Sequence, residues 1–432
     1  MCCRPWSGRW LRGVLPMLVL LMGTVDGAAV VAHAGPSVGP LEAAFARESY
    51  LPRSTATLRL YSGTRLATLQ IFRSGTEQGR TRARDVMRGV AIGRRTWVGT
   101  QLAGSGFSVP LGAWPSGLYF ARLTAPDGGL AFAPFVLRPS RLGEHRVAVV
   151  MPTQTWQAYN FRDDNSDGRG DTWYAGTGQT ARLDRPFLNR GVPPHFRHYD
   201  LPFLHWIART GKRVDVLSDE DINGTRAGRE LAKAYDLVIF SGHHEYVTDH
   251  EYRVMQQYRD AGGNLMFLFA NDFFWRIVIH GDVMTRTNQW RDLGRPEAAL
   301  IGVQYRGNDR GSRKGAWLLR QTASTSGLFA GTGLSRGSHI GRGGIEIDAR
   351  STASPPNLHV LAEIPNLYGP GFTAQMTYYT TRNGAKVFAA GAFDLIESIL
   401  EPDKPLPDRA ARDNEAGSKR FLENLWAALS KP

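Results

Sequence analysis

The chain has 432 residues, with 52 Lys and Arg against 39 Asp and Glu and a formal net charge of +13. The basic residues are scattered singly or in pairs, whereas nucleic-acid binding needs a concentrated basic footprint, so the composition argues against nucleic acid as a partner. A basic surface of this kind favours anionic cell-envelope polymers. The length is ample for two domains.

The first residues predict a cleavable secretory signal peptide over residues 1–34. Three features carry this prediction: a positive n-region, an apolar core too short to span a bilayer, and a small-x-small cleavage site (Arg4, Arg9 and Arg12; Val14 to Val25; Ala32-His33-Ala34). An uncleaved anchor is the alternative, which Pro16 in the short core disfavours. We therefore expect a mature start near Gly35 and a secreted, periplasmic or cell-envelope location.

The remainder of the chain predicts a soluble protein without cysteine. No later segment approaches eighteen apolar residues, so we expect no transmembrane segment after cleavage. Cys2 and Cys3 both lie in the predicted signal peptide. The mature chain therefore has no disulfide, no thiolate metal site and no cysteine nucleophile.

Residues 35–143 predict a small all-β, Ig-like sandwich. Short, β-rich and partly alternating runs punctuated by Gly and Pro recur at this spacing (Ala56 to Leu60, Ala67 to Phe72, Leu118 to Leu123 and Ala131 to Leu137). No catalytic cluster stands out in this segment. We interpret it as a packing or binding module.

Residues 144–432 predict an α/β domain with a doubly wound parallel sheet. Apolar runs typical of strands buried on both faces alternate with helical patterns (strands Val147 to Met151, Val214 to Leu217, Leu237 to Phe240 and Leu265 to Phe269; helices Gly228 to Tyr235 and Glu251 to Ala261). In such sheets ligands bind beyond the carboxyl ends of the strands. The residues at those ends are therefore the candidate site.

Polar and aromatic residues follow three of these predicted strands. WQAYN ends at Asn160 after the first strand, His243-His244-Glu245-Tyr246 follows the third, and Asn271-Asp272 follows the fourth. A Glu with an adjacent His, facing Tyr and Asn, can bind a hard or borderline cation or act as acid and base. A carboxylate that caps the start of a helix is an equally good explanation of Glu245.

Seven motifs in one order extend this interpretation. WQAYN, HYDLPFLHW, GHHEY, AGGNLMFLFAND, a Trp-Arg pair, PEAALIGVQY and EID together make the chain, from about Val147 to its end, similar to the C-terminal domain of the N,N-dimethylformamidase large-subunit family. The resemblance implies a fold like the class I glutamine amidotransferases, without their cysteine, and hydrolysis of an amide C–N bond. The chain differs from that family in its predicted export and in its β-rich segment, where the formamidase has a larger N-terminal region.

The resemblance also implies a mononuclear iron site. Its two tyrosines and one glutamate fall on Tyr159, Tyr199 and Glu245, and the neighbouring catalytic residues fall on His243, Asn271 and Glu346. Phenolate and carboxylate oxygens are hard donors suited to ferric iron, and a histidine beside them could orient a ligand or shuttle a proton. The alternative for each tyrosine is a buried ring with a satisfied hydroxyl.

A second metal is predicted in the segment after WQAYN. Oxygen donors stand at alternate positions with a glycine at the sharp turn, as in calcium loops of the dockerin or thrombospondin-repeat type (Asp163, Asn165, Asp167 and Asp171). Tyr174 stands where an EF-hand has its last glutamate, so another segment must complete the calcium shell. The alternative is a solvated Asp- and Gly-rich turn.

Two functions remain open from the sequence. The first is an exported, metal-dependent hydrolase of a small amide-like substrate, acting alone or as a homo-oligomer. The second is a non-catalytic cell-envelope or carbohydrate-binding protein on the same fold, with tryptophans as stacking platforms (Trp156, Trp173, Trp206 and Trp275). Fold alone does not decide between them.

Overall fold

The computed structural model describes residues 40–61, 66–79, 81, 83–99, 106–176, 178–320, 327–403, 406 and 408–431. The predicted signal peptide and its cleavage site lie outside the described residues. Within these ranges, no helix combines the length and the apolar character needed to cross a membrane.

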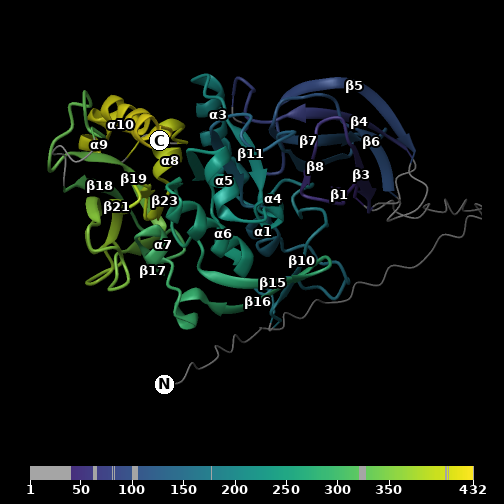
Figure 1. Ribbon diagram of the computed structural model, residues 1–432. Coiled ribbons are helices and arrows are strands. Elements are labelled where there is room, and N and C mark those ends of the chain that lie inside the picture. Colours follow the sequence, from purple (N-terminus) through teal and green to yellow (C-terminus); the bar gives the residue numbers. More distant parts are fainter. Residues whose placement is uncertain are drawn as a thin grey trace, which may run out of the picture. The chain divides into compact units, whose positions relative to one another are not determined.

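The N-terminal strands form two sheets around one hydrophobic core, seen in purple and blue in Figure 1. One sheet has the order β1-β3-β6 and the other has the order β2-β8-β7-β4-β5. Along β3 the side chains of Ala56, Leu58 and Leu60 point into this core, and the residues between them point outward, as the period of a half-buried strand requires. The β-rich segment fits the predicted sandwich. Its strands are β1 (Ala43–Phe45), β2 (Ser49–Tyr50), β3 (Thr55–Leu60), β4 (Leu66–Arg73), β5 (Val90–Gly99), β6 (Gly106–Pro110), β7 (Gly117–Thr124) and β8 (Leu130–Leu137).

The largest sheet has eleven strands and is mixed. Its order is β11-β9-β12-β14-β22-β21-β20-β18-β19-β17, and β23 pairs with β19. Neighbours from β11 to β22 are parallel, whereas all pairs from β22 onward are antiparallel. The strands are β9 (Val147–Met151), β11 (Asp215–Ser218), β12 (Leu237–Phe240), β14 (Asn264–Phe267), β17 (Gln304–Asn308), β18 (Lys314–Leu319), β19 (His339–Ala349), β20 (His359–Ile364), β21 (Ala374–Thr380), β22 (Lys386–Ala389) and β23 (Ala392–Phe393).

The expectation of a doubly wound, glutamine amidotransferase-like α/β fold is therefore wrong. The secondary structure is 35% strand and 21% helix, arranged in several mixed sheets. The predicted strands at β9 and β12 have the observed bounds, but none of the strands after Phe269 is among the predicted elements. Several of those later strands, such as β17 and β20, are only partly buried, so they lack the continuous apolar runs that identify strands buried on both faces.

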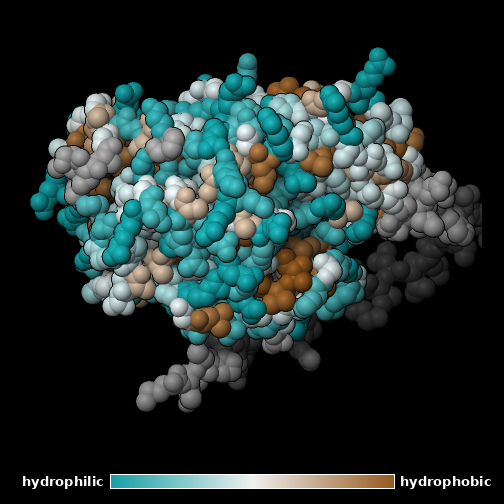
Figure 2. Space-filling model, in the orientation of Figure 1, coloured by the Kyte–Doolittle hydropathy of each residue, from teal (hydrophilic) through white to brown (hydrophobic). Residues whose placement is uncertain are grey.

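The central strands separate two hydrophobic cores. On β9, Val147, Val149 and Met151 belong to one core, whereas Ala148 and Val150 belong to the other. Helices cover both faces, and in Figure 1 the C-terminal helices lie in yellow beside β19. Figure 2 shows a largely hydrophilic surface on the face that it presents. The helices used below are α1 (Thr153–Ala158), α2 (Phe196–Tyr199), α3 (Leu201–Arg209), α5 (Gly228–Ala234), α6 (Asp249–Asp260), α8 (Leu395–Leu400) and α10 (Glu415–Leu429).

A smaller sheet lies next to the candidate site. Its order is β10-β16-β15-β13, with β10 (Thr180–Arg182), β13 (Tyr246–Thr248), β15 (Trp275–His280) and β16 (Val283–Gln289). Its strand β13 directly follows the GHHE segment, and it pairs in parallel with β15. This pairing joins the ends of two neighbouring strands of the large sheet.

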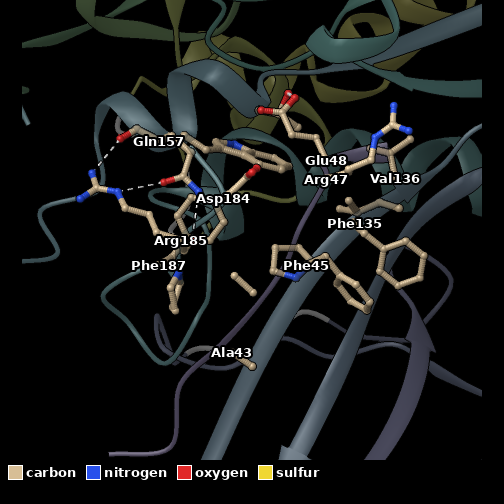
Figure 3. Close-up of a pocket in the computed structure, with 16 residues that line it drawn as sticks. Ala43, Phe45, Arg47, Glu48, Phe135, Val136, Gln157, Asp184, Arg185 and Phe187 are labelled. Atoms are coloured by element: carbon tan, nitrogen blue, oxygen red, sulfur yellow. Dashed lines mark hydrogen bonds between the residues drawn. The ribbon is translucent and has the colours of Figure 1, made fainter. Parts of the chain in front are cut away.

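The N-terminal strands contact the following segment around a small cavity of about 50 Å³ (Figure 3). The Thr153 hydroxyl donates to Glu48 at 2.5 Å, which ties α1 to the segment before β2. Arg185 is buried, and its guanidinium donates to the carbonyls of Asn160 and Asp171 at 2.9 and 3.0 Å. Arg185 therefore holds together the end of WQAYN and the Asp-rich loop. The division predicted at residues 143 and 144 falls between β8 and β9.

Candidate active site

Tyr159 is positioned by the short helix that follows β9. It lies directly after α1, where its N–H donates to the Thr155 carbonyl at 3.1 Å. The side chain of Asn160 donates to Gln157 and to the Pro186 carbonyl, which fixes the end of this turn. The Tyr159 hydroxyl then donates to Glu245 Oε2 at 2.6 Å. Two motifs that are 86 residues apart in the sequence therefore meet at one hydrogen bond.

Glu245 is held in the loop between β12 and β13. Its carbonyl accepts from the N–H groups of Phe274 and Trp275 at 3.0 and 2.9 Å, so the loop after β14 clamps its backbone. Glu245 does not cap a helix: the capping box of α6 is formed by Thr248 and Glu251. The buried carboxyl of Glu245 is thus left to interact with the candidate site.

His243 and Glu346 complete an acidic cluster with Glu245. His243 Nε2 lies 3.6 Å from Glu245 Oε2 and 3.7 Å from Glu346 Oε2. These distances are too long for hydrogen bonds. His243 Nε2 and Glu346 Oε2 are both buried without a hydrogen-bond partner among the described residues.

Asn271 is fixed beside these carboxyls by its backbone. Its φ of 57° is left-handed, and its N–H donates to both oxygens of the buried Asp348 at 3.0 and 3.1 Å. Its side-chain amide lies close enough to the carboxyls of Glu245 and Glu346 to lower the pKa of each, against the larger effect of burial. Its Oδ1 is a further buried atom without a hydrogen-bond partner in the described part of the chain.

Glu346 is directed into the site by an irregular strand. The pairing of β19 shifts register against β17 between Tyr305 and Gly307, and against β23 between Gly344 and Ile347. Between these shifts, Ile345 has a φ of 65°, which is a genuine outlier for a β-branched residue. Bulges of this kind re-aim a side chain next to active sites.

Tyr199 lies at the end of α2 and shares a cavity with the other residues. Its ring stacks on His195, with centroids 4.9 Å apart, and contacts Phe393 at 5.2 Å. Phe393 in turn contacts the His243 ring at 4.7 Å. The structure therefore places Tyr199 near His243 through Phe393, without a hydrogen bond to Glu245 among the described contacts.

These side chains face a cavity of about 860 Å³. Tyr159, Tyr199, His243 and Glu346 all line it. Glu245 and Asn271, the other two predicted catalytic and iron-binding residues, do not line the cavity themselves. Each contacts a residue that does: Glu245 accepts from Tyr159, and Asn271 lies beside Glu346. The structure thus brings all six residues into one region.

Burial shifts the pKa values of the site in opposite directions for acids and for histidine. Burial raises the pKa of Glu245 to about 7, although hydrogen bonds from Tyr159 and its neighbours lower it in part. Burial, and then the charge of Glu245, raise the pKa of Glu346 well above its usual value. Burial lowers the pKa of His243 well below 6.5, so the imidazole is neutral. Burial also raises the pKa values of Tyr159 and Tyr199.

The donor set fits a hard metal cation. Phenol and carboxyl oxygens meet in a buried region. In addition to burial, the charges of three further acids, Glu245, Asp348 and Asp272, raise the pKa of Glu346, so the region is rich in negative charge. Buried charges in proteins are paired or coordinate metals. The buried atoms of His243, Glu346 and Asn271 that have no hydrogen-bond partner among the described residues also suit a cationic or polar ligand at this point.

A second group that could hold a metal lies on the wall of the same cavity. His198, Glu397 and Asp403 each offer a ligand atom, and these atoms lie within 4.8 Å of one another. The sequence motifs did not predict this group. Arg197 already donates to both oxygens of Asp403 at 2.7 Å, and Arg342 lies 3.9 Å from Glu397. The arginines therefore compensate part of its negative charge.

The predicted calcium ligands lie in a single tight loop. Asp163 Oδ2 accepts from the Gly168 N–H at 2.8 Å, and Asn165 Oδ1 accepts from the Asp167 N–H at 2.9 Å. Asp171 accepts from the Asn165 side-chain amide at 3.2 Å. The four residues share one loop, but their carboxylates are not among the metal-holding groups found in the described residues.

The tryptophans proposed as stacking platforms are mostly covered. Trp156 and Trp173 are 5% and 4% exposed, so neither offers an open ring face. Trp206 packs edge-on against Trp426, and Lys212 lies 4.1 Å above its ring. Trp275 is half-buried beneath Arg286. Among the described residues, none of these four tryptophans therefore has an exposed ring.

Two further tyrosines reach the site, and the sequence pattern assigned neither of them a catalytic or metal-binding role. The Tyr174 hydroxyl donates to Tyr159 at 2.8 Å and to Glu245 Oε2 at 3.1 Å, and its ring stacks on that of Tyr159 at 4.5 Å. Tyr246 contacts Tyr174 through its hydroxyl and accepts from Trp173 Nε1 at 3.2 Å. Tyr246 directly follows Glu245 in the sequence, and this position could have indicated its place in the site. Tyr174 follows the Asp-rich loop, and no sequence pattern there indicates a role in the site.

Comparison with known proteins agrees with the seven motifs. The family model described as "N,N-dimethylformamidase beta subunit-like, C-terminal" matches residues 104–404. The N,N-dimethylformamidase beta subunits of an Alcaligenes species and of Paracoccus aminophilus are each 24% identical, over 303 and 305 residues, 55% of this chain.

The chain spans 38% of the length of each of these two relatives. Among solved structures, the superoxide reductase (neelaredoxin) from Ignicoccus hospitalis covers 24% of this chain, and 81% of its own, at 16% identity. Its TM-score of 0.15 is too low to indicate a shared fold. The motifs, their convergence on one cavity and the match over 104–404 lead to one conclusion. The chain belongs to the N,N-dimethylformamidase beta subunit-like, C-terminal family.

Proposed function

We propose that the protein is an exported hydrolase of amide C–N bonds. The observation that carries this proposal is the convergence of Tyr159, the His243–Glu245 segment and Glu346, from three separate parts of the chain, around one cavity. The family match supports an amide hydrolase-like class, and the two relatives are named for a formamidase. Export rests on the N-terminal sequence pattern alone.

The second part of the proposal is a mononuclear iron held by Tyr159, Tyr199 and Glu245. Hard oxygen donors suit ferric iron, and the buried atoms without partners support a cation at this point. When bound, iron supplies Lewis-acid polarisation of the amide carbonyl. The identity of the metal rests on the donor chemistry and on the family resemblance.

The other residues then have roles set by their positions. His243 Nε2 faces both carboxyls at 3.6 and 3.7 Å, so it can hold or pass a proton at that atom. Glu346, on the cavity wall, is placed to pass a proton to the leaving nitrogen. Tyr174 donates to Tyr159 and keeps its ring in place. The Asp348 carboxylate holds Asn271 against the two glutamates.

The test is metal content and colour, measured together with activity. Protein prepared with iron available should hold stoichiometric iron and show a tyrosinate-to-iron charge-transfer band. Tyr159→Phe and Tyr199→Phe should weaken that band, because each deletes an oxygen donor and keeps the ring. Tyr235→Phe is the matched control, since Tyr235 is buried elsewhere and hydrogen bonds to Asp215.

His243→Ala should retain the metal and lower the turnover of formamide substrates by about a hundredfold or more, as loss of an acid–base group does. The hydrolase proposal fails if purified protein contains no transition metal and the two tyrosine variants change neither spectrum nor activity.

A calcium ion at Asp163, Asn165, Asp167 and Asp171 is the third part of the proposal. The four residues lie in one loop, and Asp163 accepts from the Gly168 N–H at the glycine position that calcium loops require. The loop is tied to Tyr174 and Tyr159 through Thr172, whose hydroxyl donates to the Ala158 carbonyl at 2.5 Å.

A further inference from the structure

We propose that the substrate is an amide that also carries an anionic group, such as a carboxylate, several bonds away from the scissile carbonyl. The inference rests on the proposed function, because it assigns a substrate class to the same cavity. Two features of the cavity support it: its size, and the arginines on its wall.

The cavity is much larger than a simple formamide requires. Its volume of about 860 Å³ lies in the upper part of the range, roughly 300–1,000 Å³, that buries a drug-sized ligand. The acyl and amine parts of a five-heavy-atom amide would occupy only the end near Tyr159 and Glu346. The rest of the wall, including Leu188, Val192 and Phe196, is available to a larger substrate.

Five cationic side chains line this cavity: Arg84, Arg197, Arg310, Lys314 and Arg342. Three of them have acidic partners. Lys314 and Arg342 both approach Asp394, and Arg197 donates to Asp403.

Arg84 and Arg310 differ from these three. Both are exposed, and neither makes a hydrogen bond or an ion pair with any described residue. They are therefore the two cations of the wall that remain for a ligand.

The two arginines lie beside residues of the proposed site. Arg310 follows Asp309, whose N–H donates to the Ile345 carbonyl, and Asn308 pairs with Glu346 across the two strands. The charge of Arg84 is close enough to His195 to contribute, after burial, to lowering the pKa of its imidazole, and the His195 ring stacks on Tyr199. Both arginines therefore line the same cavity as Tyr199 and Glu346, the residues of the proposed site that lie nearest to them in these contacts.

An arginine is suited to this role. Its guanidinium binds a carboxylate through two parallel hydrogen bonds, and it stays charged at every relevant pH. A charge-assisted hydrogen bond at a partly exposed position corresponds to about tenfold in affinity. The attraction weakens at high salt, because ions screen exposed charges.

The experiment compares two amides that differ only in charge: 4-formamidobenzoate and formanilide. The wild-type protein should hydrolyse the carboxylate-bearing amide with the higher kcat/KM. Arg310→Gln and Arg84→Gln should each lower the ratio of the two kcat/KM values about tenfold. Arg336→Gln, which removes an exposed arginine outside the cavity, should leave the ratio unchanged. The ratio should also fall as sodium chloride is raised.

A ratio near one in the wild-type protein, or a ratio that neither cavity variant changes, overturns the inference. If the protein hydrolyses neither amide, calorimetric binding of the same two compounds tests the anion preference separately from the proposed function. Tighter binding of 4-formamidobenzoate that Arg310→Gln weakens supports it. Equal affinities, or no binding of either compound, overturn it.

Discussion

At the scale of single residues, unusual backbone angles gather around the candidate site. His195, Asn271, Ile345 and Asp394 all have positive φ values, and all but Asn271 line the cavity. Left-handed conformations of non-glycine residues cost about 1–3 kcal/mol each and persist where the surroundings hold them. Ile345 is the most informative of the four, because its strained backbone directs the adjacent Glu346.

The strain at Ile345 predicts an unusual stability effect. Ile345→Gly should change the free energy of unfolding by less than about 1 kcal/mol, since relief of a strained φ offsets the loss of a half-buried side chain. Ile347→Gly, on the same strand, should lower it by about 4 kcal/mol, because Ile347 is fully buried. Urea unfolding measures both. Equal losses in the two variants would show that Ile345 stores no strain.

At the scale of elements, the Asp-rich loop connects the proposed calcium to the tyrosines. Arg185 binds the loop at Asp164 and at the Asp171 carbonyl, and the chain continues directly to Tyr174. Tyr174, which follows this loop, contacts Tyr159 and Glu245, so the loop is joined to the site by direct hydrogen bonds.

Calcium should therefore stabilise the protein. A ligand that binds only the folded state raises the free energy of unfolding by about 2.7 kcal/mol at a hundredfold excess over its dissociation constant. Added calcium should raise the melting temperature and EGTA should lower it. Asp167→Ala should abolish this response, whereas Asp127→Asn, in a turn of the N-terminal strands, should keep it. Identical melting curves with EGTA and with calcium would exclude a calcium site.

At the scale of the whole molecule, a buried histidine joins three distant segments. His205 on α3 lies with Nε2 3.2 Å from Glu77 Oε1 and Nδ1 2.9 Å from Glu401 Oε1. Burial lowers the pKa of His205, but the hydrogen bond with Glu401 and the nearby carboxyl of Glu77 outweigh burial and raise it above 6.5. Glu77 follows β4 and Glu401 follows α8, so this contact links the N-terminal and C-terminal parts of the fold.

The raised pKa sets the direction of a pH effect. A histidine whose pKa is higher in the folded state contributes stability that is complete below about pH 6.5 and is lost as pH rises through the folded-state pKa. His205→Gln should cost about 3 kcal/mol at mildly acidic pH and less at alkaline pH. Chemical denaturation across this pH range measures the effect, with the exposed His280→Gln as control. An equal loss at both pH values would contradict a charged His205.

Several features could be predicted from the sequence because they depend on local pattern. The apolar runs of β9, β12 and β14 identify buried strands, and the polar groups that follow them, such as Tyr159, Glu245 and Asn271, do approach one another. Burial and period are encoded in windows of a few residues. The roles of these residues remain predictions, which the metal and activity measurements above address.

The sequence by itself determined which residue types follow which strands. It also determined the order of the seven motifs, which agrees with membership of the family. Only the tertiary structure decided the direction of the later strands, the bulge at Ile345 that aims Glu346, and the approach of Tyr174 to Tyr159. The physical reason is that these features depend on contacts between residues far apart in the chain. A short apolar pattern specifies that a strand is buried, but its partner, direction and register come from the packing of the whole sheet.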